Sequence, residues 1–391
     1  MSNGWRYAKI GEVCVVERGG SPRPIDKYIT DDPSGINWIK IGDTNDSMYI
    51  TETAQKIIPE GMKKSRYVQP GDFLLSNSMS FGRPYILKID GCIHDGWLVL
   101  RDKDNLFDKR FLYYYLSSPS TYQKFKNMAV GGVVNNLNSD MVRGVLVPIP
   151  TLDEQIEIVT VLDKLNEIIV NRKQQLSKLD ELVKSRFIEM FGNAENKIPI
   201  GELCNVTGGY SFKSGDISND GAIKILQIGN VYLDNVSWET TNYLPEGFDE
   251  KYSKFMLNEG DIVIALTRPI IQSLGNVKAC IVKSRDLPCL LNQRVGRITV
   301  KEGKNIFLEF IYSCLMTDDF TKHVESCSIG CSQPNISTKD IENYLIPNAP
   351  YEEQKLFAEF KKQTEKLKLE IKESLEKLET LKKSLMQKYF G

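Results

Sequence analysis

Residues able to carry out catalysis are sparse and scattered in this chain of 391 residues. His94 and His323 are its two histidines, and they lie in different halves of the sequence. A histidine-based metal site or a catalytic triad that uses both is therefore not expected. No G-x-G and no G-x-x-x-x-G-K-[S/T] occurs, so the chain lacks the dinucleotide fingerprint and the P-loop.

One short segment comes close to a catalytic motif. Asn348-Ala349-Pro350-Tyr351 resembles the N-P-P-[Y/F] signature with which amino-methyltransferases hold the exocyclic amine of a flipped base. Ala349 breaks the signature, and no glycine motif for a cofactor accompanies it. We interpret the segment as the lead-in to a helix, and we expect no catalytic residue in the chain.

The eight cysteines never form a C-x-x-C pair, so no metal site is expected from them. No apolar run reaches membrane-spanning length, and the first residues contain no signal-peptide core. These features predict a cytoplasmic location, where the thiols stay reduced.

The elements that organise the chain are two long helical stretches, residues 151–192 and 350–391. They align at an offset of 199 residues, which places Glu154-Gln155 on Glu353-Gln354 and Phe191-Gly192 on Phe390-Gly391. Neither stretch has an internal proline, and each ends in glycine. Thr151 and Glu154 have the spacing of a capping box, and Pro350 suits a first helical turn.

Apolar residues recur in both stretches at alternating steps of three and four, which is typical of a helix-pairing seam. The expected seam positions are Leu162, Leu165, Ile169, Leu176, Leu179 and Val183, with Arg172 as a break, and Phe357, Phe360, Leu367, Ile371, Leu378, Leu381 and Leu385, with Thr364 and Ser374 as breaks. We expect the two stretches to pair with each other in an intramolecular coiled coil. A zipper between two copies of the chain is the alternative.

The regions between these stretches also repeat, so the order is globular region, helix, globular region, helix. Matching anchors are Ile10-Gly11-Glu12 with Ile200-Gly201-Glu202, Gly19-Gly20 with Gly208-Gly209, Ile41-Gly42-Asp43 with Ile228-Gly229-Asn230, and Gly71-Asp72 with Gly260-Asp261. Strands are predicted at 13–17, 37–41, 73–76, 85–89 and 97–100, and helices at 108–128 and about 305–324, whose aromatic residues we assign to the core.

Composition fits an ordinary globular protein, with 41% hydrophobic and 26% charged residues. The formal net charge is −1. A protein that holds DNA alone usually carries excess positive charge, since phosphate contacts dominate affinity. The sequence therefore disfavours a solitary DNA binder, but it is compatible with a subunit whose partners supply much of the phosphate contact.

In the order and duplication of its motifs, the whole chain resembles the specificity (S) subunits of type I restriction-modification systems. The resemblance rests on the opening WRYAKIGEVCVVERGGSPRP, the blocks GDFLLSNSMSFGRP and GDIVIALTRPIIQSLG, the NLN and QPNIS turns, and the lead-ins PIPTLDEQIEIV and PNAPYEEQKLFAEF. Each lead-in opens a long helix that ends in FG.

The resemblance implies an α/β (α+β) fold with two target-recognition domains, residues 1–150 and 193–349, separated by two long antiparallel helices, residues 151–192 and 350–391. The internal repeat would give the chain pseudo-twofold symmetry, and each domain would read one half of a bipartite, asymmetric site in double-stranded DNA. Family members bind two methylation (M) subunits, and restriction (R) subunits complete the nuclease. S-adenosylmethionine, ATP and Mg are expected on those partners, with no cofactor on this non-catalytic chain.

Base reading needs side chains with paired donors and acceptors, such as Arg for guanine and Asn or Gln for adenine. On that basis we predict DNA contacts from sixteen residues in the two domains. They are Arg18, Ser21, Arg23, Asn77, Ser78, Arg83, Asn135 and Asn136 in the first domain, and Ser211, Lys213, Arg268, Gln272, Asn292, Gln293, Arg294 and Gln333 in the second.

Three other functions are alternatives to the type I subunit. A specificity subunit of a related bipartite-site restriction system is one alternative. A fused restriction-methylation enzyme would need motifs that the chain lacks, and a coiled-coil scaffold without DNA binding would not need two diverged globular domains.

Overall fold

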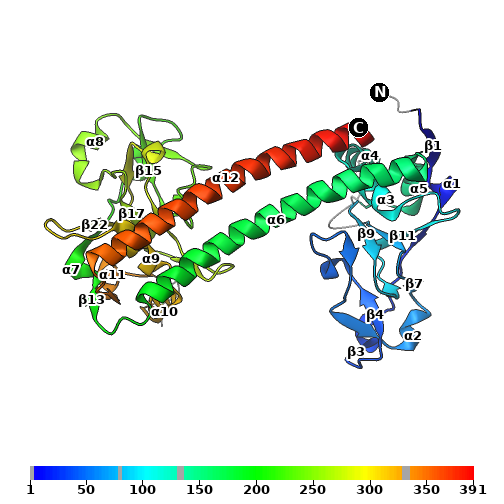
Figure 1. Ribbon diagram of the computed structural model, residues 1–391, viewed down its shortest axis with the longest axis horizontal. Coiled ribbons are helices and arrows are strands. Elements are labelled where there is room, and N and C mark those ends of the chain that lie inside the picture. The colour runs from blue at the N-terminus through cyan, green and yellow to red at the C-terminus, as the bar shows by residue number, and fades with distance from the viewer. Residues whose placement is uncertain (1–3, 78–81, 130–135, 328–334) are drawn as a thin grey trace. The chain divides into compact units, whose positions relative to one another are not determined.

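The computed structural model of the chain describes residues 4–77, 82–129, 136–327 and 335–391. It divides into two compact units, Met1–Gln174 with Lys372–Gly391, and Gln175–Ile371. Each unit holds one globular domain together with part of each long helix (Figure 1). We call domain 1 the part of the first unit that precedes the first long helix, and domain 2 the part of the second unit between the two long helices.

The predicted long helices are present as α6 (Leu152–Phe191) and α12 (Tyr351–Phe390), of 40 residues each. Asn348-Ala349-Pro350 directly precedes α12, in keeping with a helix lead-in. The capping box at the start of α6 is confirmed: the backbone N–H of Thr151 donates to Glu154 Oε2 at 2.8 Å, and the backbone N–H of Glu154 donates to Thr151 Oγ1 at 3.3 Å.

Within each unit the two helices run antiparallel. In the first unit Lys382 Nζ donates to Asn166 Oδ1 at 2.8 Å, and Lys173 lies 3.2 Å from Glu379. In the second unit Lys368 Nζ lies 2.7 Å from Asp180 Oδ1, and further along the rings of Phe187 and Phe357 pack at 5.4 Å between centroids. Partner numbers rise on one helix as they fall on the other, which is the antiparallel order, and these contacts join two helices of one chain.

The seam predicted for α6 is correct, because Leu162, Leu165 and Ile169 are buried and the later seam positions are half-buried. The seam predicted for α12 is partly wrong. Leu367 and Leu381 are half-exposed on the outside of the pair, whereas Thr364 and Lys368 are buried in it. The prediction chose the leucines because they are apolar. The face of the helix that begins at Gln354 and Phe357 continues through positions 361, 364, 368 and 371, so it passes through Thr364 and Lys368 instead.

The repeated Glu-Gln motif attaches each helix to its domain. Gln155 is fully buried; its Oε1 accepts the N–H of Asp108 at 2.8 Å, and its Nε2 donates to Leu106 O at 2.9 Å and Pro150 O at 3.1 Å. Gln354 does the same in the second unit with Phe307 N–H at 3.2 Å and Ala349 O at 2.8 Å.

The repeated Phe-Gly motif anchors the far end of each helix. Phe390 packs against Phe111 of domain 1 at 5.5 Å between ring centroids. Phe191 packs against Phe310 of domain 2 at 4.9 Å. The start of one helix and the end of the other are therefore fixed in each unit.

Domain 1 builds its sheets in the orders β2-β11-β8-β9-β5, β3-β6-β4-β10-β7 and β1-β12. Its strands are β1 (Arg6–Lys9), β2 (Cys14–Arg18), β3 (Ile29–Thr30), β4 (Ile36–Ile39), β5 (Tyr49–Ile50), β6 (Gln55–Ile57), β7 (Arg66–Val68), β8 (Phe73–Ser76), β9 (Pro84–Leu87), β10 (Gly91–Ile93), β11 (Trp97–Asp102) and β12 (Leu146–Ile149). Its helices are α1 (Ile10–Val13), α2 (Pro59–Met62), α3 (Lys109–Leu116), α4 (Pro119–Ala129) and α5 (Ser139–Gly144), with 3-10 turns η1 (Ile25–Lys27) and η2 (Ile41–Asp43).

Domain 2 builds the orders β14-β22-β17-β20, β16-β15-β21, β13-β23 and β18-β19. Its strands are β13 (Lys197–Pro199), β14 (Cys204–Gly208), β15 (Ile223–Leu226), β16 (Asn242–Leu244), β17 (Ile262–Ala265), β18 (Ile270–Ile271), β19 (Asn276–Val277), β20 (Ala279–Ile281), β21 (Cys289–Leu291), β22 (Val295–Val300) and β23 (Leu345–Pro347). Its helices are α7 (Ile200–Leu203), α8 (Phe248–Lys251), α9 (Leu308–Leu315), α10 (Asp318–Cys327) and α11 (Thr338–Asn343), with η3 (Ser214–Asp216), η4 (Ile228–Asn230), η5 (Ser253–Phe255) and η6 (Ser284–Asp286).

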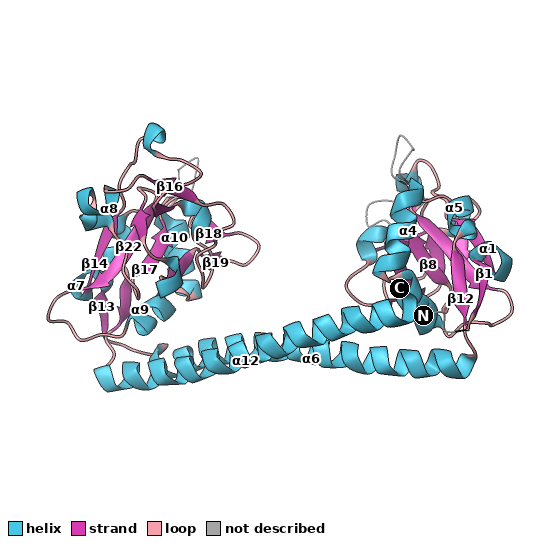
Figure 2. Ribbon diagram, turned by 90° about the horizontal axis from the view of Figure 1, so that it is seen from above, coloured by secondary structure: helices cyan, strands magenta, loops and turns pink. Residues whose placement is uncertain are grey.

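In each domain the strands gather into sheets flanked by short helices (Figure 2). The helix predicted at 108–128 is broken into α3 and α4 at Ser117-Ser118, since Pro119 cannot continue a helix interior. Phe111, Tyr115 and Phe125 are buried in the core as predicted, but Tyr122 is 45% exposed. Among the described residues, no helix combines the length and the apolar character needed to cross a membrane.

Candidate nucleic-acid interface

Four segments of domain 1 that are far apart in sequence converge at one end of its sheet. The N–H of Gly19, after β2, donates to Trp97 O at 2.9 Å, which fixes that loop against the β10–β11 turn. The N–H of Asn77, after β8, donates to Gly96 O of the same turn at 2.9 Å, and the N–H of Leu137 donates to Asn77 O at 3.0 Å. We call these four segments the loop edge of domain 1.

Domain 2 repeats this arrangement bond for bond. The N–H of Gly209 donates to Val295 O at 3.1 Å, the N–H of Leu266 to Arg294 O at 2.9 Å, and the N–H of Ile336 to Leu266 O at 2.9 Å. The segments after β14, after β17, between β21 and β22, and before α11 therefore form the loop edge of domain 2.

These bonds correct the predicted alignment of the glycine pairs by one residue. Gly19 corresponds to Gly209, and Gly20 corresponds to Tyr210, whose N–H groups donate to Ile93 O and Leu291 O respectively. A Cβ at Gly19 would lie 2.2 Å from His94 O, and a Cβ at Gly209 would lie 2.3 Å from Asn292 O. Glycine is required at this position because the backbone of the turn approaches it so closely.

Strand register then shows which residues of the two β-turns are equivalent. β11 pairs with β2, and β22 with β14, in the same register, so His94-Asp95-Gly96 corresponds to Asn292-Gln293-Arg294. The loops that follow Gly19 and Gly209 carry Ser21 and Arg23 in domain 1 and Ser211 and Lys213 in domain 2. The frame is shared, and the side chains that it carries differ.

An ionic cluster around Asp95 holds the loop edge of domain 1. Ser21 Oγ donates to Asp95 Oδ1 at 2.9 Å, Arg18 Nε donates to Asp95 O at 3.1 Å, and the exposed Arg23 lies 3.4 Å from Asp95 Oδ2. Burial alone would raise the pKa of Asp95, but the hydrogen bond from Ser21 and the charges of His94, Arg18 and Arg23 lower it overall. Arg18, Ser21 and Arg23 are thus brought together at one place.

The other residues predicted for domain 1 lie differently. Asn77 is buried, and its Nδ2 donates to Asp95 O at 2.9 Å, so it positions the turn from inside. Arg83 is exposed, donates to Asn45 O at 3.2 Å and pairs with Asp46 at 3.1 Å. Asn136 is exposed beside Leu137 on the loop edge. Ser78 and Asn135, together with Gln333 of the second domain, lie outside the described residues.

In domain 2 most of the predicted residues lie on the loop edge. Gln293 and Arg294 are exposed and Asn292 is half-buried. Arg268 is exposed and adopts a left-handed backbone with φ of 48°, a conformation that arginine rarely takes and that often marks functional positions.

The remaining predicted residues of domain 2 divide between two places. Ser211 and Lys213 are exposed in the loop after β14. Gln272 is exposed in the β18–β19 connection, and the hydrogen bonds of the structure do not join it to the loop edge.

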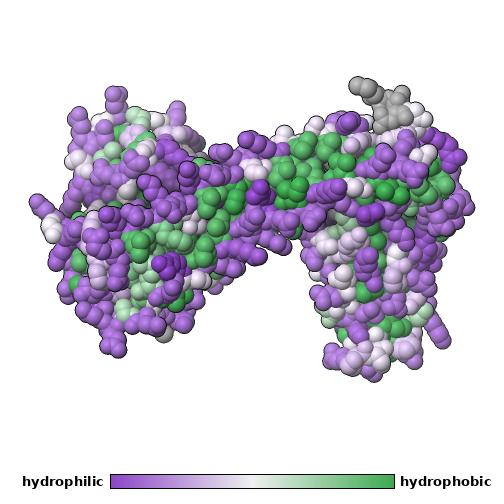
Figure 3. All heavy atoms as spheres, viewed as in Figure 1, coloured by the Kyte–Doolittle hydropathy of each residue, from purple (hydrophilic) through white to green (hydrophobic). Residues whose placement is uncertain are grey.

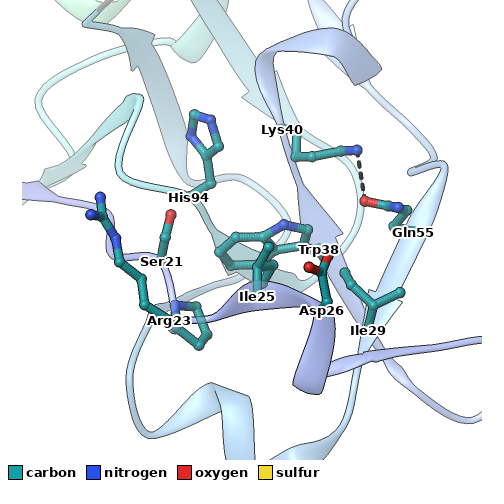
Figure 4. Close-up of a pocket in the computed structure, with 10 residues that line it drawn as sticks. Ser21, Arg23, Ile25, Asp26, Ile29, Trp38, Lys40, Gln55 and His94 are labelled. Atoms are coloured by element: carbon teal, nitrogen blue, oxygen red, sulfur yellow. Dashed lines mark hydrogen bonds between the residues drawn. The ribbon is translucent and has the colours of Figure 1, made fainter.

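A cavity of about 350 Å³ opens beside the loop edge of domain 1. Ser21, Arg23 and His94 lie on one side of it, and Trp38 lies between them and Lys40, whose Nζ donates to Gln55 Oε1 at 2.7 Å (Figure 4). Its lining is completed by Pro22, Ile25, Asp26 and Ile29. The hollow reaches from the loop edge onto β4 and β6, and much of its lining is apolar.

Sequence reasoning missed His94 and Asp95, which occupy the centre of the domain 1 site. Neither residue type belongs to the arginine, asparagine and glutamine set on which the prediction of base contacts rests. The internal repeat carried the missing signal: aligning CIHDGW with LLNQRV places His94-Asp95-Gly96 on the predicted triplet Asn292-Gln293-Arg294. In the described part of the chain, no group of three or more His, Cys, Asp or Glu side chains could hold a metal ion.

The comparison with protein families agrees with this duplicated arrangement. A family model described as the type I restriction modification DNA specificity domain matches residues 2–181 and again residues 195–383. The chain is 29% identical to the type I restriction enzyme MjaVIII specificity subunit of Methanocaldococcus jannaschii, over 98% of this chain and 91% of that protein. It is 30% identical to the EcoAI specificity subunit of Escherichia coli, over 54% of this chain and 36% of that protein.

Solved structures share the fold. A chain of a type I R-M system, solved in work on complex assembly and conformational transition, superposes with a TM-score of 0.63 at 17% identity, covering 100% of this chain and 98% of that one. The S subunit of a type I restriction-modification system from M. genitalium gives a TM-score of 0.55 at 15% identity, covering 100% and 98%.

Proposed function

Because this chain belongs to the type I restriction modification DNA specificity family, we propose that each of its two domains reads one half of a bipartite, asymmetric site in double-stranded DNA. The chain supplies sequence specificity and carries out no chemical step itself. The observation that carries the proposal is the loop edge, which both domains build from the same four segments with the same hydrogen bonds and equip with different side chains.

The difference in side chains supports two different half-sites. Domain 1 presents Arg18, Arg23 and His94 around Asp95, whereas domain 2 presents Asn292, Gln293 and Arg294. Arginine pairs with guanine N7 and O6 in the major groove, and Asn or Gln pairs with adenine N6 and N7. Two domains that share a backbone arrangement but present different side chains would recognise different half-sites, so the DNA site would be asymmetric.

We propose further that the outer faces of the helix pair bind two methylation subunits. Apolar residues that are about half-exposed gather over α6 and α12 (Figure 3). Four pairs of them repeat at the offset of 199 residues: Leu152 with Tyr351, Ile168 with Leu367, Val170 with Leu369, and Leu182 with Leu381. A repeated apolar surface suits two copies of the same partner.

The low net charge of −1 fits this assignment, since such partners would supply much of the phosphate contact. Restriction subunits would complete the assembly in the cytoplasm. S-adenosylmethionine, ATP and Mg would be bound by the partner subunits, and this chain would need no cofactor.

Genome-wide mapping of N6-methyladenine tests the proposal. Cells that express the chain with its cognate methylation subunits should carry a split, asymmetric methylated motif, and this motif should vanish when the gene for the chain is deleted. An unchanged pattern, with the methylation subunits confirmed as expressed, would contradict the proposal and favour a scaffold role.

A single substitution tests the loop edge of domain 2. Arg268→Ala should weaken binding of the assembled complex to the mapped site by roughly tenfold, the effect of one lost base contact, and leave the melting temperature of the chain unchanged. Unchanged cognate affinity would remove Arg268 from the interface.

A further inference from the structure

The loop edge of domain 2 carries an exposed aromatic cluster that has no counterpart among the described residues of domain 1. Tyr210 packs against Tyr252 at 4.6 Å, against Phe255 at 5.4 Å and against Phe212 at 5.2 Å between ring centroids, and Phe248 packs against Tyr252 at 5.3 Å. Tyr210 is 38% exposed, whereas Phe212 is buried beneath it. The cluster thus leaves the Tyr210 ring partly exposed on a packed aromatic base.

Backbone hydrogen bonds place Tyr210 beside the turn between β21 and β22. Its N–H donates to Leu291 O at 2.9 Å, and its carbonyl accepts the N–H of Gln293 at 3.0 Å. The equivalent residue of domain 1 is Gly20, which has no side chain to present. Tyr210 and the exposed Gln293 are therefore joined directly through their backbones, and Arg294 follows in the same turn.

The ring of Tyr210 is held by packing against the rings of Tyr252, Phe255 and Phe212. The neighbouring hydroxyl of Tyr252 raises the pKa of Tyr210. Lys251 Nζ lies 5.2 Å from the centroid of the Tyr252 ring and 5.5 Å from that of Phe248. The charges that act on Tyr210 come from Lys251 and Asp216, and the exposed Lys213 lies three residues further along the loop.

A rigid aromatic face beside amide and guanidinium donors has a specific counterpart in duplex DNA. In the major groove, thymine is marked by its 5-methyl group, which apolar side chains contact, next to acceptors that amides and arginine recognise. Lysines at the rim of such a surface suit the flanking phosphates. Adenine, guanine and cytosine offer no comparable apolar group in that groove.

We propose that Tyr210 is a specificity residue of domain 2 that packs on the 5-methyl group of a thymine in one half-site. The inference rests on the proposed function, because it requires domain 2 to read duplex DNA. It names the feature of the half-site that Tyr210 distinguishes and assigns that feature to one domain.

The test replaces thymine by deoxyuridine, which removes the methyl group and leaves base pairing intact. The full-length chain, assembled with its methylation subunits, is titrated with duplexes of the mapped site that carry deoxyuridine in neither half-site, in one or in the other. Substitution in one half-site should weaken binding about fourfold, the effect of losing one buried methyl contact. Tyr210→Ala should abolish this difference, whereas Tyr210→Phe, which keeps the ring, should preserve it.

Tyr232→Ala, at an exposed tyrosine outside the cluster, is the matched control and should keep the full response to deoxyuridine. Equal binding of thymine and deoxyuridine duplexes by the unaltered chain would overturn the inference without any variant having to fold. A response that persists in Tyr210→Ala would overturn it too. Failure of the proposed function is distinguishable, since the unsubstituted duplex would then show no sequence-specific binding.

Discussion

The two halves of this chain use one frame to hold two chemically different surfaces. At the loop edge, domain 1 is ionic: Asp95 gathers Ser21, Arg18 and Arg23 around a backbone that has glycine at position 20. Domain 2 has Gln293 in place of Asp95 and Tyr210 in place of Gly20, and its surface is aromatic and amide-rich.

A duplicated domain can present a different surface without a change of fold. The backbone hydrogen bonds that fix the turn are retained in both halves, so the side chains at the turn are free to differ. Gly19 and Gly209, which the frame needs, are the same residue in both halves, whereas Gly20 and Asp95 are replaced by Tyr210 and Gln293.

The largest effect is expected where the frame is shared. Gly19→Ala and Gly209→Ala place a Cβ 2.2 Å and 2.3 Å from a backbone oxygen, a clash that no side-chain rotation relieves. Each should lower the free energy of unfolding by roughly 2–3 kcal/mol, measured by urea denaturation, and should disrupt its own half of the interface.

Gly42→Ala and Gly229→Ala are the matched controls, because they are also repeat-equivalent but a Cβ there meets nothing within 4 Å. If either Gly19→Ala or Gly209→Ala changed stability as little as these controls, the backbone arrangements of the two loop edges would not be equivalent.

The second effect concerns the glutamines that join helix and domain. Gln155→Leu leaves one N–H and two carbonyl groups without their partner, and Gln354→Leu leaves one N–H and one carbonyl. Both should destabilise the chain by roughly 1–3 kcal/mol in denaturant titrations, with Gln155→Leu the larger. The exposed Gln174→Leu should change stability by less than about 0.5 kcal/mol; equal losses at all three sites would contradict the role of the buried amides.

The third effect concerns Asp95, which is present at the loop edge of domain 1 and replaced by Gln293 at the loop edge of domain 2. The pKa of Asp95 is lowered in the folded chain, so its contribution to stability is present above the unfolded pKa of about 3.9 and is lost as the pH falls through the folded value. Asp95→Asn should lower stability at pH 7 by roughly 0.5–1 kcal/mol, and this difference should shrink as the pH drops from 5 toward 3.

Melting temperatures across that pH range give the measurement. The fully exposed Asp46 provides the control, since Asp46→Asn should show a negligible difference at any pH. A difference between Asp95→Asn and the unaltered chain that stayed constant down to pH 3 would mean that shape, not charge, holds the turn.

Much of the architecture could be predicted because the sequence contains an internal repeat. The offset of 199 residues located both long helices, and β-branched and aromatic runs located β2, β4, β8, β9 and β11 to within about two residues. The apolar pattern failed to predict where one helix ends and the next begins. It continues through Pro119, yet this proline divides the predicted helix into α3 and α4.

The loop edge could be predicted only in part, because hydrogen bonds between distant segments create it. Residue type singled out Arg18, Gln293 and Arg294, which the fold does bring to this edge, but the same reasoning chose Asn77, whose amide is buried. Burial of a polar side chain depends on what packs over it, and that information lies elsewhere in the sequence.

The seam of α12 shows the same limit, and it supplies the smallest predicted effect. Lys368 is buried where the equivalent residue of α6 is Ile169, and its Nζ lies 2.7 Å from both Asp180 and Glu365. Those carboxylates are about half-exposed, so removing the lysine would let water solvate them again. Lys368→Ile should therefore change the free energy of unfolding at pH 7 by less than about 1 kcal/mol, as found when buried ion pairs give way to apolar packing.

The dependence on pH distinguishes the ion pair from packing. Burial alone would lower the pKa of Lys368, but the bonds to Asp180 and Glu365 raise it overall. A lysine with a raised pKa stabilises the folded chain below the unfolded pKa of about 10.4, and this stabilisation is lost as the pH rises through the folded pKa. Above pH 10 the free energy of unfolding of Lys368→Ile should therefore rise relative to that of the unaltered chain. The exposed Lys366→Ile should show no such gain. A loss of more than 2 kcal/mol in Lys368→Ile at pH 7 would mean that the ion pair holds the two helices together, and the two seams would then differ in mechanism as well as in sequence.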